Sequence, residues 1–226
     1  MVGRSSAAFL AAMLVFCNGA AGATKSPRSV PGVASGNPAS APTGPIGIGA
    51  IKIGMTREAI SGIPSDEAVH LAGPLLTKAG AHPDAGGRSE YEAPITAPWY
   101  GQEILSTFVF SDNRLTELYI PLDEASFDRA KTQLAEKYGP GKTVDDRKDE
   151  QCTYGNGASF KVTSGPVATQ WVQDLSVTER VSSSIKSLTF DMCPPDLRGP
   201  RIDPQTSYGL DFSRISVDPK SAANPF

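Results

Sequence analysis

The chain has 226 residues, 39% of them hydrophobic, which suits one globular domain with tails. Its 21 basic and 24 acidic side chains give a formal net charge of −3 at pH 7, so nothing in the charge balance favours nucleic acid or an anionic membrane surface as a partner. With two histidines and three cysteines in the whole chain, we expect neither a metal site nor a cofactor.

The N-terminus has the pattern of a cleavable signal peptide. Arg4 is the only charge before the predicted cleavage site, and the uncharged stretch 7–16 has the length of a signal-peptide hydrophobic region. The tripeptide Ala-Gly-Ala at 21–23 fits the recognition pattern of signal peptidase, which places cleavage between Ala23 and Thr24. The stretch is too short to span a bilayer, and no later apolar run is long enough. The sequence therefore predicts a periplasmic or secreted protein without a transmembrane span.

Cys17 offers an alternative form of export. A lipoprotein signal places the lipidated cysteine directly after a small residue, whereas bulky Phe16 precedes Cys17. Ordinary cleavage after Ala23 is the favoured interpretation, and an envelope lipoprotein anchored through Cys17 is the alternative.

Composition divides the remaining chain into three parts. Residues 24–45 hold five prolines and no acidic residue, which predicts a flexible linker. Residues 46–193 are expected to form the folded domain, and residues 194–226 a Pro-rich tail. That tail also contains apolar residues that are compatible with part of it lying across the domain: Leu197, Ile202, Tyr208, Leu210, Phe212, Ile215 and Val217.

The first part of the domain predicts short helices and a loop. Thr56 is a plausible N-cap of a helix that ends at Pro64. A second, interrupted helix is expected over 65–78, followed by a long loop over 79–101 with one strand near Tyr91.

The middle of the domain gives stronger patterns. Two paired strands are expected over 103–110 and 114–122, joined by a turn at Asp112-Asn113. The next segment, 124–138, predicts a helix that stops at Gly139-Pro140. Its apolar stripe consists of Phe127, Ala130, Leu134 and Tyr138.

The last part of the domain predicts further strands, near 159–163, 168–172, 175–180 and 185–192. The order of helix, strands, helix and strands favours an α+β domain, in which helices pack on one face of an antiparallel sheet.

Two short motifs resemble those of known exported proteins. The segment Ile51-Lys52-Ile53-Gly54-Met55-Thr56-Arg57-Glu58-Ala59-Ile60 resembles the opening of small proteins with the BamE-like or β-lactamase-inhibitor-protein-like fold. The helix exit Lys137-Tyr138-Gly139-Pro140 is similar to one found in uncharacterised periplasmic proteins. The resemblance implies a helical hairpin on an antiparallel sheet, and a role in binding other proteins without catalysis.

The two cysteines that remain after cleavage predict a disulfide. Cys152 and Cys193 are an even pair in an exported chain, for which a bridge is the simplest use. A metal site is the alternative, but His70 and His82 lie at no ligand spacing from the pair.

No familiar catalytic motif is present. The chain lacks G-x-S-x-G and H-E-x-x-H, and we expect both histidines to be exposed and solvated. An acidic cluster at Asp145, Asp146, Asp149 and Glu150 is interleaved with Arg147 and Lys148. The interleaving favours a solvated polar loop over an acid–base pair.

An aromatic pair is the candidate for partner binding. Trp99 and Tyr100 lie in a loop rich in proline and glycine, where an exposed pair could anchor a partner, although Trp99 could instead fold back onto the sheet. The sequence thus favours a non-catalytic exported protein-binding module, such as an inhibitor, an immunity-type protein or an envelope accessory protein. Its partner is expected to be another envelope or secreted protein. The alternatives are a carboxylate-based hydrolase and the lipoprotein anchored through Cys17.

Overall fold

The computed structural model describes residues 44–79, 87–194 and 201–218. The predicted signal peptide, Cys17, nearly all of the predicted linker and His82 lie outside the described residues. The described helices are α1 (Arg57–Ser61) and α2 (Glu124–Tyr138). The described strands are β1 (Gly47–Ile48), β2 (Ile51–Lys52), β3 (His70–Leu71), β4 (Leu76–Thr77), β5 (Ser89–Thr96), β6 (Ile104–Ser111), β7 (Arg114–Leu122), β8 (Lys142–Asp145), β9 (Lys148–Thr153), β10 (Ser159–Asp174), β11 (Glu179–Phe190) and β12 (Gln205–Ser216).

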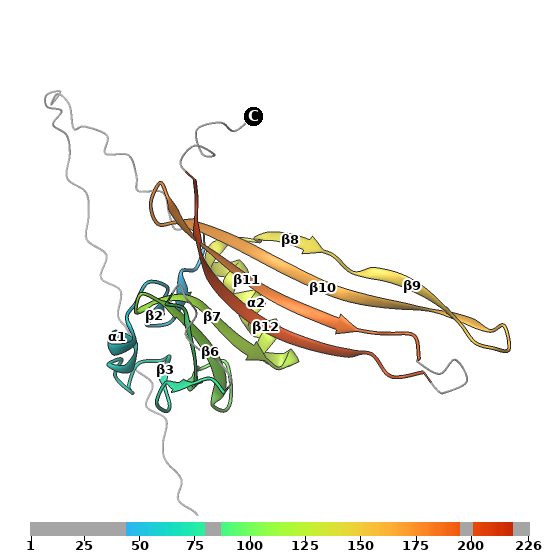
Figure 1. Ribbon diagram of the computed structural model, residues 1–226, viewed down its shortest axis with the longest axis horizontal. Helices are drawn as coiled ribbons and strands as arrows, with labels where there is room; N and C mark the ends of the chain where they lie inside the picture. Colours follow the sequence, from blue (N-terminus) through green and yellow to red (C-terminus); the bar gives the residue numbers. More distant parts are fainter. Residues whose placement is uncertain (1–43, 80–86, 195–200, 219–226) are drawn as a thin grey trace, which may run out of the picture. The chain divides into compact units, whose positions relative to one another are not determined.

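One large antiparallel sheet dominates the described chain (Figure 1). Its ten strands run in the order β3-β5-β6-β7-β12-β11-β10-β8, with β4 pairing to β5 and β9 pairing to β10. The strands β1 and β2 pair with each other and form a separate small hairpin. Most neighbours in the large sheet follow one another along the chain, and the pairing of β7 with β12 joins the segments that are most distant in sequence.

The expected α+β fold is wrong, because the described chain is mostly β-sheet and helices contribute little to it. Helix α1 has only five residues. The segment 65–78, expected to be helical, instead contains the two short strands β3 and β4. Gly73-Pro74 interrupts this segment, and too few residues remain on either side to offset the cost of nucleating a helix.

Strand β12 lies within the segment assigned to the Pro-rich tail and fills a central place in the sheet. It pairs with β11 along its whole length and with β7 over residues 208–213. The prolines of that segment all fall outside β12, while Tyr208, Leu210 and Phe212 occupy alternate positions within it. Leu210 and Phe212 are buried. The sheet thus extends beyond residue 193.

Strand β10 is continuous where two strands were expected. Gly165-Pro166 does not turn the chain back, but marks the point where β10 changes its outer partner from β9 to β8. Gly165 has a φ of 131°, and a Cβ there would lie 2.8 Å from the carbonyl oxygen of Asp146. Glycine is therefore required at this crossing of backbones.

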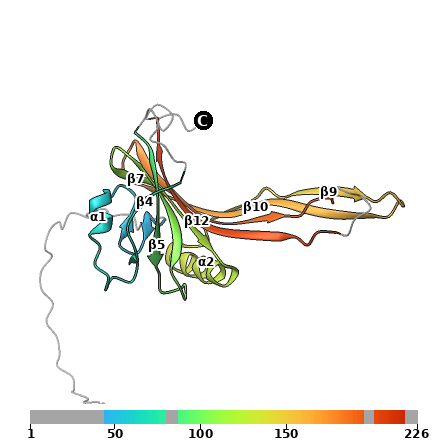
Figure 2. The same cartoon turned by 60° about the horizontal axis from the view of Figure 1, so that its bottom comes forward.

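Helix α2 has the predicted bounds. The Asp123 side chain accepts a hydrogen bond of 2.7 Å from the Ser126 amide at its start, and Gly139 ends it with a φ of 84°. The predicted stripe packs against the core, with Ala130 buried and the Phe127 ring 4.8 Å from that of Tyr208 on β12. Figure 2 shows α2 lying along β12.

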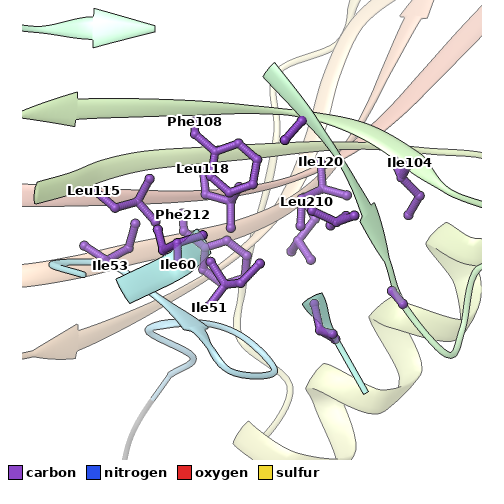
Figure 3. Close-up of a cluster of buried hydrophobic side chains, with 14 of the residues drawn as sticks. Ile51, Ile53, Ile60, Ile104, Phe108, Leu115, Leu118, Ile120, Leu210 and Phe212 are labelled. Carbon is purple, nitrogen blue, oxygen red and sulfur yellow. The ribbon is translucent and has the colours of Figure 1, made fainter. Parts of the chain in front are cut away.

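The core lies between one face of the sheet and the elements that cover it. Figure 3 shows Ile51, Ile53 and Ile60 from the N-terminal elements meeting strand residues that are buried on the sheet. These strand residues include Phe108, Leu115, Leu118, Ile120, Leu210 and Phe212. Burial of this cluster, at about 1.5–3 kcal/mol for each large apolar side chain, is the main source of stability.

Candidate binding surface

The face of the sheet opposite the core presents a row of mostly polar side chains. Directly paired residues place their side chains on the same face, and the register links Thr107 to Tyr119, Tyr119 to Asp211, Asp211 to Ser184 and Ser184 to Gln170. These five residues cross β6, β7, β12, β11 and β10, and we call the face that they define the open face. Both described helices pack on the other side, where they join the core.

The alternation of buried and exposed side chains along β7 separates the core face of the sheet from the open face. Leu118, Ile120 and Leu122 are buried, whereas Glu117, just before Leu118, and Tyr119, just after it, point to the open face. A strand with period-two alternation exposes one face to solvent while the other is buried.

Tyr119 stands at the centre of the open face with 36% of its surface exposed. Its ring lies over Gly209 of β12, where a Cβ would come within 2.6 Å of the ring. The Lys186 ammonium lies 5.5 Å from the ring centroid and 2.8 Å from the Asp211 carboxylate. Contacts from β11 and β12 therefore fix the orientation of this exposed aromatic ring.

A set of ion pairs continues the open face toward β5. Arg88 contacts Glu90 at 3.0 Å and Glu117 at 3.3 Å, and Lys78 lies 3.7 Å from Glu90. Between these pairs and Tyr119 is a shallow hollow of about 220 Å³. The paired charges of both signs leave the face close to neutral, with its long side chains held in place.

Trp99 and Tyr100, the predicted anchors, are half-buried and pack against the core. Their rings contact each other edge to face at 6.3 Å. The Trp99 carbonyl accepts hydrogen bonds of 3.4 Å from Ser126 and Arg129 of α2. The structure thus places Trp99 against the helix, and partner binding through this pair stays a prediction.

Two members of the acidic cluster, Asp145 and Asp149, form ion pairs on the surface. Asp145 is hydrogen-bonded to Arg147 at 2.6 and 2.9 Å, which lowers the pKa of Asp145 to about 2. Hydrogen bonds from Lys161 and Thr163 lower the pKa of Asp149. Carboxylates held ionised in this way cannot serve as a general acid near neutral pH.

A larger cleft, missed by the sequence analysis, lies beside α1. It has a volume of about 630 Å³, and Arg57, Glu58 and Tyr91 contribute to its lining. Arg57 donates hydrogen bonds to the Tyr91 hydroxyl at 2.6 Å and to Asn113 at 3.1 Å. The hydrogen bond from Asn113 to Glu58 lowers the pKa of that carboxyl. The polar groups of this cleft thus bond to one another and hold α1 to the β6–β7 turn.

The predicted disulfide between Cys152 and Cys193 is confirmed, with the two Cα atoms 5.5 Å apart. Near it, buried Asp191 accepts a hydrogen bond of 2.9 Å from Arg201 and one of 3.3 Å from the Thr163 amide. This end of the sheet therefore combines a covalent link with a buried carboxylate that is paired with arginine.

Neither histidine takes part in a metal site that the structure describes. His70 lies 2.7 Å from the carbonyl of Glu67, and His82 is outside the described ranges. Within residues 44–79, 87–194 and 201–218, no three His, Cys, Asp or Glu side chains gather to hold a metal ion. The same residues contain no helix long and apolar enough to cross a membrane.

No family model, curated protein or solved structure matches this chain. The resemblance of residues 51–60 to BamE-like proteins therefore stays a prediction. The sequence analysis also missed Tyr119, although its alternation with buried leucine and isoleucine in β7 was a signal that could have placed it on the exposed side.

Proposed function

We propose that this protein is an exported, non-catalytic module that binds another envelope or secreted protein through its open face. The observation that carries the proposal is the position of Tyr119, an exposed aromatic ring that neighbouring strands hold in place at the centre of a broad sheet surface. Tyrosine is enriched among the residues that dominate protein–protein binding energy, and a ring that is already ordered loses little entropy on binding.

The surroundings of Tyr119 favour a protein over other partners. Ion pairs such as Lys186–Asp211 and Arg88–Glu117 flank the ring on both sides. Neutral, paired charge gives no general attraction for a nucleic acid or an anionic bilayer, whereas a central aromatic with a polar rim is the anatomy of protein interfaces. The resemblance of residues 51–60 to protein-binding families implies the same class of partner.

The pKa values within the acidic cluster support the non-catalytic part of the proposal. The resolved pKa shifts among the carboxylates of the acidic cluster are downward, for Asp145 and Asp149, which keeps both ionised. A carboxylate-based hydrolase would need one carboxyl with a raised pKa, inside a pocket.

The disulfide supports export. A bridge such as Cys152–Cys193 persists in oxidising compartments, which include the periplasm and the extracellular space. Signal cleavage after Ala23 belongs to the proposal, and the intact mass of protein from a periplasmic fraction tests it by showing a chain that starts at Thr24. A diacyl adduct on Cys17 would replace this with the lipoprotein form.

Site-specific photo-crosslinking in cells tests the binding surface. A photo-reactive amino acid at Tyr119 should capture a specific protein, whereas the same group at exposed Glu136 on α2 should capture none at comparable yield. The captured protein is then identified by mass spectrometry and purified for titration.

Affinity measurements complete this test. Tyr119→Ala should weaken binding by about 2 kcal/mol or more, roughly 30-fold, as expected for a central interface residue. Tyr154→Ala is the control: it removes a different tyrosine, which packs against Phe160, and should leave the affinity within twofold. Equal loss for the two variants, or crosslinks at Glu136 alone, would place the interface elsewhere.

A further inference from the structure

A second hollow, of about 320 Å³, lies between α2 and the β1–β2 hairpin. Leu134 and Tyr138 of α2 and Ile48 of β1 form its walls, and Leu210 and Phe212 of β12 contribute to its floor. The volume is within the range of small-molecule sites, which are mostly apolar with a few polar groups. We call this hollow the α2 groove.

The charged residues that line the α2 groove are Lys52 and Lys137, and its lining includes no carboxylate. Among the described residues, neither lysine forms an ion pair with an acidic side chain. Burial lowers the pKa of Lys52, and the nearby charge of Lys137 lowers it further. Two cations therefore face one apolar hollow without a counter-charge.

A purely structural role accounts for only one of these lysines. Lys137 lies in the last turn of α2, where the helix dipole favours a positive charge, and it also contacts the Tyr138 ring at 5.2 Å. Lys52 ends β2 and has no such support. An anion in the groove would offset the repulsion between the two ammonium groups and the cost of burying Lys52.

We propose that the α2 groove binds a small anionic amphiphile, whose apolar tail fills the hollow and whose carboxylate lies at Lys52 and Lys137. Charge complementarity selects this occupant over the chain's own N-terminal linker, since residues 24–45 contain no acidic side chain. The groove lies on the core side of the sheet, so the inference does not depend on partner binding at the open face.

Calorimetric titration of the mature protein with three probes tests the proposal. Decanoate, decanol and decyltrimethylammonium share one tail and differ in head-group charge. Decanoate should bind at least about tenfold more tightly than decanol, because hydrogen bonds to a charged group are worth more than about 1.4 kcal/mol. Its binding should show a negative heat-capacity change from burial of the tail. Decyltrimethylammonium should bind most weakly.

Variants locate the site. Lys52→Gln combined with Lys137→Gln should reduce the affinity for decanoate at least about tenfold and leave that for decanol nearly unchanged. Lys131→Gln, on the same helix but outside the groove lining, is the matched control and should have no effect. Gln133→Trp places a large side chain at the exposed edge of the groove and should weaken the binding of both decanoate and decanol. A thermal melt of this variant verifies that the variant folds.

Three outcomes would overturn the proposal: equal affinities for the three probes, decanoate binding that survives the double lysine change, or absence of binding in the mature protein because its own chain or a second copy fills the groove. Tyr119→Ala should leave decanoate binding unchanged, so failure of this inference and failure of the open-face interface are distinguishable.

Discussion

The two ends of β10 are stabilised in different ways. From Gly165 to Asp174 the strand pairs with β11, and over residues 167–170 it also pairs with β8. Trp171 is buried in this part and donates a 3.0 Å hydrogen bond to the Gly139 carbonyl at the end of α2. From Ser159 to Ser164 the strand pairs only with β9, outside the part of the sheet that α2 contacts. We call these the near end and the far end.

The far end buries few side chains. Val162 and Cys152 are buried there, whereas the rest of β9 is polar and exposed. In place of an apolar core, it has the disulfide to Cys193 and the hydrogen bonds of Asp191. The comparison shows that one continuous strand can depend on apolar burial at one end and on covalent and ionic links at the other.

The largest loss of stability is expected when a core side chain of the near end is truncated. Phe212, which is 1% exposed, lies in the row of core residues that contains Trp171. Phe212→Ala should lower the free energy of unfolding by about 3–5 kcal/mol, because it removes a buried ring and leaves a cavity. Urea denaturation measures this loss.

Phe190 provides the matched control, since it is 51% exposed near the far end. Phe190→Ala should change the free energy of unfolding by less than about 1 kcal/mol. Similar losses for the two phenylalanines would show that burial does not distinguish the two ends.

Breaking the disulfide should have the next largest effect, and mainly at the far end. The bridge closes a loop of 41 residues, so reduction should lower the free energy of unfolding by about 2–4 kcal/mol. Hydrogen exchange should speed up for amides of 148–153 and 159–164, and much less for 167–172. A uniform increase along β10 would mean that the ends unfold as one unit.

Elements set by local sequence were predictable. Helix α2 and strand β7 have the predicted bounds, because each combines a clear apolar period with strong end signals. The turn at Asp112-Asn113 is confirmed by positive φ angles of 50° and 58°, a conformation these residue types tolerate. The Cys152–Cys193 disulfide followed from the even number of cysteines left after the predicted signal cleavage.

Features that depend on distant pairing were not predictable. The prolines on either side of β12 suggested a loose tail. The segment is recognised as a central strand only when β12 is seen to lie between β7 and β11. Tyr119 becomes the middle of a surface only once the register brings Asp211 and Lys186 beside it. The α2 groove likewise joins Lys52 to Lys137, which no local pattern relates.

The smallest effect on stability is expected from Asp145, which lies where the near and far ends meet. Asp145 ends β8, and its carboxylate bonds to the side chain and amide of Arg147 just before β9 begins. These hydrogen bonds hold the pKa of Asp145 at about 2 in the folded protein, below the value of about 3.9 expected in the unfolded chain.

Because folding lowers this pKa, the contribution of Asp145 to stability is fully present above about pH 4 and is lost as the pH falls through about 2. The Asp145 side chain is exposed, so solvent screening keeps this contribution small. Titration of the carboxyl carbon by NMR should give a midpoint near 2 in the native protein, and a midpoint shifted toward about 3.9 in Arg147→Gln. Asp145→Asn should remove this part of the acid dependence without disturbing the far end, because the disulfide and Asp191 hold β9 and β10 independently of Asp145. A native midpoint near 3.9 would show that the Arg147 contact does not hold in solution, and that the junction depends on backbone hydrogen bonds such as that from the Asp146 amide to the Pro166 carbonyl at 3.0 Å.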